Sequence, residues 1–306
     1  MIRYLVHHEI DKSKWDACIE RSVNASPYAN AWYLDIISPR WDALIDGDYA
    51  AVMPLTKRKK YGIQYLYQPM LSQQLGVFST LHKEAFAIDS FLEAIPKAFG
   101  LIEIGINTLN YVSEKLPFVQ VIQKTNYELP LNEPYEVIRS RYAKSHRKNI
   151  RKAAEEAADW SIVASSYSEF YVHKMKSLDD KKANLSQRAR QSYFNTLKQL
   201  EEKGKLQTFL IYDENEALAG GICHLHFGKK VTKQTFSNDS GRRSGLMYFM
   251  MDKFIQENAG KELIIDFMGS SIPGIAHWNK GFGSMESSYE FIRINKLPWP
   301  LKWLVR

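Results

Sequence analysis

The sequence holds few of the residues that would support disulfide, thiolate–metal or membrane-spanning structure. Cys18 and Cys223 are its two cysteines, which excludes a disulfide scaffold and any zinc site with several thiolate ligands. The densest apolar stretches, residues 246–251 and 297–305, are far shorter than the roughly 20 residues that cross a bilayer. The first residues show no apolar core followed by a small-residue cleavage site. These absences predict a cytoplasmic chain without a transmembrane segment.

Length and composition indicate a folded protein of two domains. The chain has 306 residues, of which 45% are hydrophobic and 25% charged, as in globular proteins and unlike disordered ones. This length exceeds the usual size of one domain. Pro130 and Pro134 lie close together near the middle of the chain, where they should interrupt any regular element. We therefore expect domains at residues 1–130 and 131–294, followed by a tail at 295–306.

The positive charge of the chain is concentrated in one segment. Lysine and arginine number 41 against 34 acidic residues, giving a formal net charge of +7. Seven of the cations and no acidic residue lie between Arg139 and Lys152, so the rest of the chain is close to neutral. Such a segment suits a phosphate-rich ligand, a nucleic acid or an anionic membrane surface. The alternative is a helix face that is simply solvated.

Hydrophobic periodicity and turn residues predict similar element orders in the two halves. In the first half we expect a helix with Trp15, Ile19 and Val23 on its apolar face, a second helix over 81–99, and strands at 2–6, 43–45, 49–55, 61–67, 102–106 and 118–122, with a hairpin turn at Asp46-Gly47. In the second half we expect a basic helix over 136–158, a helix over 187–203 capped by Ser186, an antiparallel meander at 207–212, 218–227 and 231–236, a helix over 246–258, a strand at 263–268, a short helix at 275–279 and a last strand at 287–294. The recurrence indicates an internal duplication.

The segment 237–245 is the most informative part of the second half. Two glycines and two arginines stand there between a strand and the first turn of a helix. Free backbone N–H groups at such a place bind anions, and glycine lets a phosphate approach the backbone closely. In the alternative interpretation, Ser240 or Ser244 caps the helix and the arginines are solvated. The residues expected to bind a pyrophosphate are Gly241, Arg242, Arg243, Ser244 and Gly245.

Three motifs in the second half carry a resemblance to a known family. The expected strand–helix order, with NKGFG (residues 279–283) before the last strand, resembles the GCN5-related N-acetyltransferase (GNAT) fold. The basic segment SRYAKSHRKNIRKA (140–153) and the DFMG motif (266–269) are similar to the FemABX group, which has two GNAT units in tandem. The likeness in motifs covers about residues 135–294, and the first half matches in element order alone. The resemblance implies an α+β protein of two tandem GNAT-like domains, with mixed, mostly antiparallel sheets flanked by helices.

The resemblance also implies an activity. In GNAT enzymes an amine attacks the carbonyl of an activated acyl donor, held where two central strands splay apart. The donor is acyl-CoA in single-domain GNAT enzymes, and it is usually aminoacyl-tRNA in FemABX enzymes, whose acceptor is a peptidoglycan precursor. The chain therefore looks like an N-acyltransferase, with acyl-CoA as one implied co-substrate and without a metal. Its implied acceptor bears an amine and belongs to the cell-wall or lipid-linked precursors.

Donor-binding residues follow from the same resemblance. Thr235, Phe236 and Ser237 end the fourth GNAT-like strand, whose backbone in the family receives the donor's pantetheine arm and carbonyl. The segment 242–247 stands where the family has Gln/Arg-x-x-Gly-x-Gly/Ala, and it matches at its first and fourth positions. Met247 departs from this pattern, which weakens the case for CoA and favours aminoacyl-tRNA.

Three further residues are candidates for catalysis. Lys280 of the NKGFG motif could stabilise the charge that develops on the tetrahedral intermediate. His277 stands where many GNAT enzymes have a tyrosine acid, and its imidazole could pass the proton. Asp266 could position the substrate amine or merely cap the turn that follows it.

Other interpretations remain open at this point. The chain could be a catalytically degenerate module that binds nucleic acid or anionic lipid through the basic segment. His224 and His226 share one strand face, but no carboxylate or cysteine cluster completes a metal shell around them. The tail at 295–306 could pack back on the first domain, as the resemblance implies, or its aromatic and basic residues could contact a membrane interface.

Overall fold

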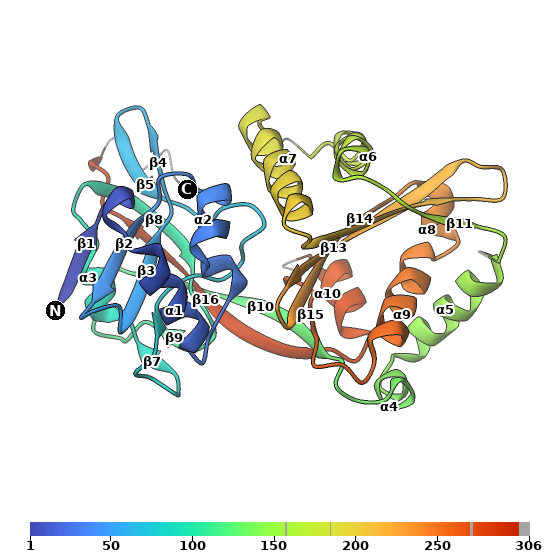
Figure 1. Cartoon of the computed structure of the whole chain (residues 1–306), viewed down its shortest axis with the longest axis horizontal. Helices are drawn as coiled ribbons and strands as arrows, with labels where there is room; N and C mark the ends of the chain where they lie inside the picture. The colour runs from blue at the N-terminus through green and yellow to red at the C-terminus, as the bar shows by residue number, and fades with distance from the viewer. Residues whose placement is uncertain (157, 184, 270–271, 300–306) are drawn as a thin grey trace. The chain divides into compact units, whose positions relative to one another are not determined.

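The protein is described by a computed structural model that covers all residues except 157, 184, 270–271 and 300–306 (Figure 1). The chain forms two compact units. Unit 1 contains residues 1–125 and the described residues from Ser288 onward, and unit 2 contains residues 126–287. The boundaries fall within two long strands, β10 (Gln120–Pro130) and β16 (Met285–Asn295). The two prolines do interrupt regular structure, because β10 ends at Pro130 and α4 begins after Pro134, whereas the boundary between the two units lies slightly earlier, after Thr125 and within β10.

Unit 1 contains a four-stranded sheet in the order β1-β2-β3-β6 and the strands β16-β8-β5-β4 of a second sheet (Figure 1). A short parallel pair, β7 with β9, completes its strands among the described residues. The elements are β1 (Ile2–Leu5), α1 (Lys12–Arg21), α2 (Ala31–Ile37), β2 (Asp42–Asp46), β3 (Ala51–Leu55), β4 (Lys57–Lys60), β5 (Ile63–Leu66), β6 (Phe78–Ser79), β7 (Phe86–Ala87), α3 (Asp89–Ala94), β8 (Phe99–Gly105) and β9 (Asn110–Tyr111), with 3₁₀ turns at His7–Glu9 and Pro27–Ala29.

Local signals predict part of unit 1 correctly. The β2–β3 hairpin is confirmed, with Asp46 opposite Ala51 and Gly47 at a positive φ of 57°. The helix expected over 81–99 is wrong: α3 covers Asp89–Ala94 alone, and strands β7 and β8 take the flanking residues. Phe99 begins β8 and is 1% exposed, so its burial in the sheet decides against the helix. Val23 lies beyond the end of α1 and is exposed.

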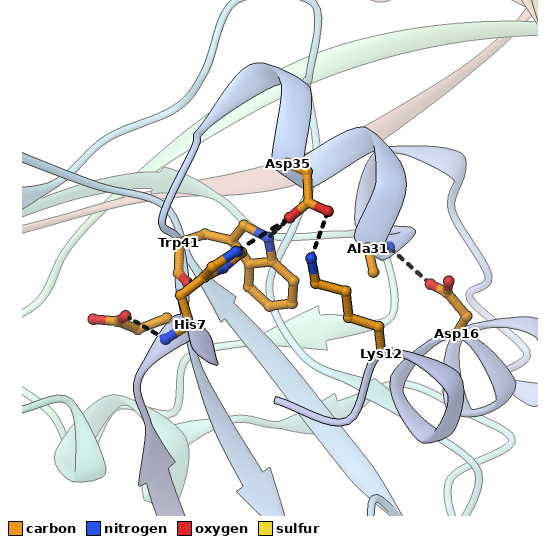
Figure 2. Close-up of polar contacts among 7 residues, drawn as sticks. His7, Lys12, Asp16, Ala31, Asp35 and Trp41 are labelled. Atoms are coloured by element: carbon orange, nitrogen blue, oxygen red, sulfur yellow. Dashed lines mark hydrogen bonds and ion pairs between the residues drawn. The ribbon is translucent and has the colours of Figure 1, made fainter. Parts of the chain in front are cut away.

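A network of polar contacts joins α1, α2, the 3₁₀ turn that follows β1, and Trp41 (Figure 2). Asp35 of α2 accepts from Lys12 Nζ at 2.7 Å and from Trp41 Nε1 at 3.0 Å, and lies 3.6 Å from His7 Nε2. Asp16 caps α2 by accepting its first backbone N–H at 2.7 Å. Each carboxylate of this network therefore has donors from within the chain.

Unit 2 contains a six-stranded arrangement in the order β11-β12-β13-β14-β15-β10. Its strand pairs are antiparallel except β14 and β15, which are parallel. Helices α6 and α7 lie on one face of these strands, and α5, α9 and α10 lie on the other (Figure 1). The elements are α4 (Tyr135–Ser140), α5 (Lys144–Glu156), β11 (Ser161–Ala164), α6 (Tyr167–Asp180), α7 (Gln187–Glu202), β12 (Leu206–Tyr212), β13 (Leu218–Phe227), β14 (Lys230–Ser237), α8 (Asp239–Arg243), α9 (Leu246–Asn258), β15 (Ile264–Asp266) and α10 (Pro273–Lys280).

Most expected elements of unit 2 are confirmed. The meander is formed by β12, β13 and β14, α9 has the expected bounds, and Ser186 caps α7 by accepting from the Ala189 N–H. The single basic helix over 136–158 is wrong, because the chain breaks between α4 and α5 so that the Ala143 N–H can donate to Gly281 O at 2.9 Å. Helix α6 is missing from the sequence-based prediction, although a capping box at Ser166 marks its start.

The described start of the tail packs on unit 1. The Lys296 N–H donates to Gly100 O at 2.8 Å, and Leu297 is 6% exposed. A Cβ on Gly100 would lie 2.9 Å from Leu297 Cδ2, so glycine permits this close contact. Residues 300–306 of the expected tail lie outside the described residues.

Candidate functional site

The parallel strands β14 and β15 separate part of the way along β14. Their register pairs Lys230 with Ile264 and ends where Thr232 meets Asp266. Beyond this point β14 continues to Ser237, whereas β15 stops. The Met268 N–H, which would continue the ladder, donates instead to Asp266 Oδ1 at 2.8 Å. The last five residues of β14 therefore form an edge that β15 does not cover.

The backbone groups on this open edge can be assigned from the strand register. The Asn238 N–H donates to Ala219 O at 3.0 Å, so in the antiparallel ladder the even-numbered residues of β14 face β13. The N–H and C=O groups of Lys233, Thr235 and Ser237 then face the open edge. Lys174 of α6 donates from Nζ to Thr235 O at 2.6 Å, which agrees with this assignment. The edge offers backbone hydrogen bonds to an extended ligand.

A cavity of about 560 Å³ follows the open edge of β14. It is lined by Lys174, Lys233, Gln234, Thr235, Ser237, Arg242, Met247, Gly274, Ile275 and Trp278. A second cavity of about 790 Å³, on the α6 side, shares Ser237 and Arg242 with it. Phe236 also lines this second cavity, but its ring packs against Phe170 of α6 and the residue is 6% exposed, so most of its side chain lies in the core.

Two lysines of this cavity are partly buried and have pKa values far below their usual range. Burial, and next the positive charge of Lys174, lower the pKa of Lys233 to about 7. Burial, and next the charge of Lys181, lower the pKa of Lys174 to about 8. Lys233 Nζ lies 4.4 Å from the ring centroid of Trp278 and 5.3 Å from that of Phe267, in cation–π geometry. Near pH 7 both groups stand close to the point of proton exchange.

Neither lysine was predicted from the sequence, although the spacing of Lys174 on its helix indicates that its side chain is partly buried. Lys174 follows Phe170 by four residues, which places it on the helix face that Phe170 buries. A lysine on such a face has to reach a partner or a cavity. No such pattern marks Lys233. It faces the cavity because β14 and β15 separate, and this separation depends on residues distant in the sequence.

The expected anion-binding loop is a short capped helix. Asn238 accepts the Gly241 N–H with its side chain at 2.8 Å, so the expectation that this N–H is free for a phosphate is wrong. The N–H groups of Arg242, Ser244 and Gly245 also donate to carbonyl groups of the same segment. A Cβ on Gly241 would lie 2.5 Å from Ala219 O, so this glycine is required by packing against β13.

The other residues of this segment are also engaged in the structure. Arg242 forms an ion pair with Asp239, one turn earlier, while still lining both cavities. Ser244 is 4% exposed and donates from Oγ to Gly241 O at 3.1 Å. Gly245 has a φ of 76° and is the N-cap of α9, and the Arg243 carbonyl accepts from Lys152 Nζ at 3.1 Å. Their binding roles stay predictions.

The three catalytic candidates lie outside the lining of the cavity along β14, although His277 and Lys280 are one turn apart on α10. Lys280 is 68% exposed at its side chain and pairs with Glu286 at 3.3 Å, and His277 is exposed on α10. Neither residue lines the cavity along β14. Asp266 is 3% exposed, burial raises its pKa, and it accepts the Met268 N–H, which is the turn-capping alternative. The part that Lys280, His277 and Asp266 play in catalysis stays a prediction.

The NKGFG motif has a clear packing role. A Cβ on Gly281 would lie within 2.3 Å of three atoms of the His146 ring, so only glycine fits there. Gly283 has a φ of 73°, which favours glycine. Phe282 is fully buried, and its ring packs edge-on against those of Tyr142 and His146. The motif holds the end of α10, and with it Trp278, against the core.

The basic segment forms one wall of a separate groove between α5 and α9. This groove, of about 640 Å³, is lined by Arg139, Lys144, Arg147, Lys148, Ile150, Arg151, Ala154, Phe249, Asp252 and Gln256. Asp252 is 8% exposed, and burial raises its pKa, while the Tyr135 hydroxyl donates to its oxygens at 2.9 and 3.0 Å. The groove therefore has five cations and one carboxylate in its lining, and that carboxylate already accepts from a tyrosine.

No cluster of three or more metal-ligating side chains occurs among the described residues. His224 stacks on Phe254 with ring centroids 4.1 Å apart, and burial lowers its pKa to about 3. Cys223 is fully buried, and burial raises the pKa of its thiol to about 12. Within residues 1–156, 158–183, 185–269 and 272–299, no helix is both long and apolar enough to span a bilayer.

Comparisons with solved structures identify the fold. The chain is similar to FemX, with a TM-score of 0.65 and 13% identity over 99% of each chain. It is also similar to a conserved protein of unknown function from Bacteroides thetaiotaomicron, with a TM-score of 0.54 and 10% identity over 96% of this chain and 99% of that one. No protein-family model and no curated protein matches the sequence. These likenesses confirm the predicted fold class, a mixed α+β chain of two tandem GNAT-like units related to the FemABX fold.

Proposed function

We propose that the protein is an N-acyltransferase that binds its acyl donor along the open edge of β14. The observation that carries the proposal is the end of the β14–β15 ladder at Thr232 and Asp266, next to a cavity large enough for an extended ligand. The similarity in fold to FemX supports it. In this proposal the N–H groups of Thr235 and Ser237 bind the donor and align its carbonyl.

The chemistry places modest demands on side chains. The neutral amine of the acceptor attacks the donor carbonyl carbon, and a C–N bond forms. The C–S or C–O bond to the leaving group then breaks, and the proton lost by the amine goes to that leaving group. Backbone N–H groups on the open edge would stabilise the oxyanion, with Lys280 and His277 as the predicted further contributors.

The environment of α8 favours aminoacyl-tRNA over acyl-CoA as the donor. The N–H groups that would bind a CoA pyrophosphate are satisfied within the segment, and Arg242 is already paired with Asp239. The groove between α5 and α9 offers five cations for a phosphodiester backbone. An amine of a cell-wall or lipid-linked precursor is the proposed acceptor, and the cytoplasm the proposed location.

A donor panel tests this proposal. Purified protein is incubated with acetyl-CoA, longer acyl-CoAs or aminoacyl-tRNAs, and thermal unfolding is followed. A donor at 100 times its dissociation constant should stabilise the fold by roughly 2.7 kcal/mol. We expect this from an aminoacyl-tRNA, followed by loss of its aminoacyl ester when amines are added. Stabilisation by acyl-CoA and thiol release would instead assign the CoA donor.

Filling the cavity tests its location. A Cβ on Gly274 meets nothing within 4 Å, and Gly274 lines the cavity, so Gly274→Trp should fold and occupy the donor space. Val172→Trp, at an exposed position on α6, is the matched control. Transfer should fall at least about tenfold in the first variant and stay unchanged in the second. Equal activity in both would contradict a donor site along β14.

The second candidate function is a degenerate module that holds a polyanion through the α5–α9 groove. The five cations that line this groove favour it. It predicts binding to RNA or anionic vesicles that weakens steeply with salt, and no turnover with any donor. Transfer from any donor in the panel would exclude this candidate.

A further inference from the structure

The cavity along β14 has an unbalanced charge. Its lining includes three basic side chains, Lys174, Lys233 and Arg242, and no acidic one. Arg242 is matched by Asp239. Lys174 donates to one carbonyl, Thr235 O, and neither lysine forms an ion pair with a carboxylate of the described residues. Two ammonium groups thus line one cavity without a counter-ion from the described part of the chain.

Partly buried charges without partners cost free energy, so proteins rarely keep them where they serve no purpose. Trp278 and Phe267 hold Lys233 by cation–π contacts, which attract a cation but do not neutralise it. The other charged or titratable groups nearby are Lys181, which repels Lys174, the buried Cys223 thiol, and His224, whose pKa the charge of Lys233 helps to lower. None of these groups can serve as the missing anion at neutral pH.

We propose that Lys174 and Lys233 together bind an anionic group of a substrate, a carboxylate or a phosphate, inside the cavity along β14. An oxyanion placed there would accept charge-assisted hydrogen bonds from both ammonium groups. Lys174 Nζ already lies at Thr235 O, so the anion would sit beside the open edge. This inference deepens the proposed function, and rests on it in treating the anion as part of a transferase substrate.

The pKa values of the two lysines agree with such a site. Without a ligand, burial lowers both pKa values, and repulsion by Lys174 and by Lys181 adds to this for Lys233 and for Lys174 respectively, so the pKa values lie near 7 and 8 and much of the pair's charge can be lost near neutral pH. A bound anion would raise both pKa values and restore the charge. Binding should therefore take up protons at pH 8 and should weaken as the pH rises further.

The test uses three simple probes on the full chain, namely inorganic phosphate, inorganic pyrophosphate and glutarate. Isothermal titration at low salt should show saturable binding of at least one probe, and its identity separates a phosphorylated from a carboxylate substrate. Lys174→Met and Lys233→Met should each weaken that binding at least about tenfold, because one charge-assisted partner is lost. Lys233→Arg, which keeps the charge, should retain more affinity than Lys233→Met.

Lys198→Met is the matched control, since Lys198 is an exposed lysine of α7 outside the cavity. Circular dichroism and thermal unfolding establish that each variant is folded, and Lys233→Arg keeps the test valid if a methionine variant does not fold. Absence of saturable binding for all three probes, or equal binding by the wild type and folded Lys174 and Lys233 variants, would overturn the inference. Probe binding without transfer would support the anion site and count against the proposed function, whereas transfer without probe binding would do the reverse.

Discussion

Charge is handled in opposite ways in the two units. In unit 1, Asp42 is completely buried and receives Tyr4 OH, the His7 N–H and the Lys57 ammonium. Asp35 is satisfied in the same manner by donors from the chain (Figure 2). In the cavity of unit 2, Lys174 and Lys233 have no carboxylate partner among the residues that the structure describes. A charge that is paired within the chain serves the fold, whereas one left unpaired in a cavity is available to a ligand.

The largest change in stability is expected at Asp42, the most buried of the paired carboxylates in unit 1. Asp42→Ala would leave the Lys57 ammonium, the Tyr4 hydroxyl and a backbone N–H without their acceptor. We expect a loss of about 3 kcal/mol in the free energy of unfolding. Urea unfolding at pH 7 measures it. Asp42→Asn, which keeps the shape and part of the hydrogen bonding, should lose less stability. A loss below about 1 kcal/mol for Asp42→Ala would contradict the view that paired buried charge stabilises unit 1.

The sequence predicts locally determined elements better than those that depend on long-range packing. Elements defined by local patterns, such as the β2–β3 hairpin and the meander, follow from turn residues and alternation. Phe99 shows the limit, because its apolar neighbours suit a helix, but burial in β8 decides its conformation. The boundary between the two units also falls after Thr125, inside strand β10, where no local turn or proline signal marks it.

The candidate site could be predicted only in part, because local patterns do not show which distant residues pack around it. The order of the strands was enough to locate the end of β14, and Thr235 and Ser237 of that strand line the cavity. Gly241 carries the same glycine signal as a phosphate loop, yet Ala219 O is the group that requires it. Lys233 gains its environment from Phe267 and Trp278, more than 30 residues away in the chain, and no local spacing can show that.

A smaller change in stability, and a gain rather than a loss, is expected when Lys233 in the cavity of unit 2 is replaced. The pKa of Lys233 falls from 10.5 to about 7 on folding, so between these values the unfolded chain binds more protons than the folded one. The penalty from its charge is complete below pH 7 and fades as the pH rises toward 10.5. Lys233→Met should therefore stabilise the protein by roughly 1–2 kcal/mol at pH 6, and this gain should shrink by pH 10.

Urea unfolding at pH 6, 8 and 10 measures this gain, with Lys198→Met as the control that should show none. A gain that is constant over this range would come from the added apolar surface rather than from the charge. A loss at pH 6 would mean that Lys233 is paired within the chain, as Asp42 is, and the contrast between the units would disappear.

The smallest effect is expected for Asp35, which is one third exposed. Asp35→Asn removes the charge opposite Lys12 but keeps an acceptor for Trp41 Nε1, so the loss in unfolding free energy should be about 0.5–1 kcal/mol. Because solvent screens this pair, the loss should decrease further in 0.5 M salt, whereas that of Asp42→Ala should not. Urea unfolding at both salt concentrations makes the comparison. If the two variants responded alike to salt, burial would not be what separates them, and the inference from unpaired charge in the cavity of unit 2 would lose its physical basis.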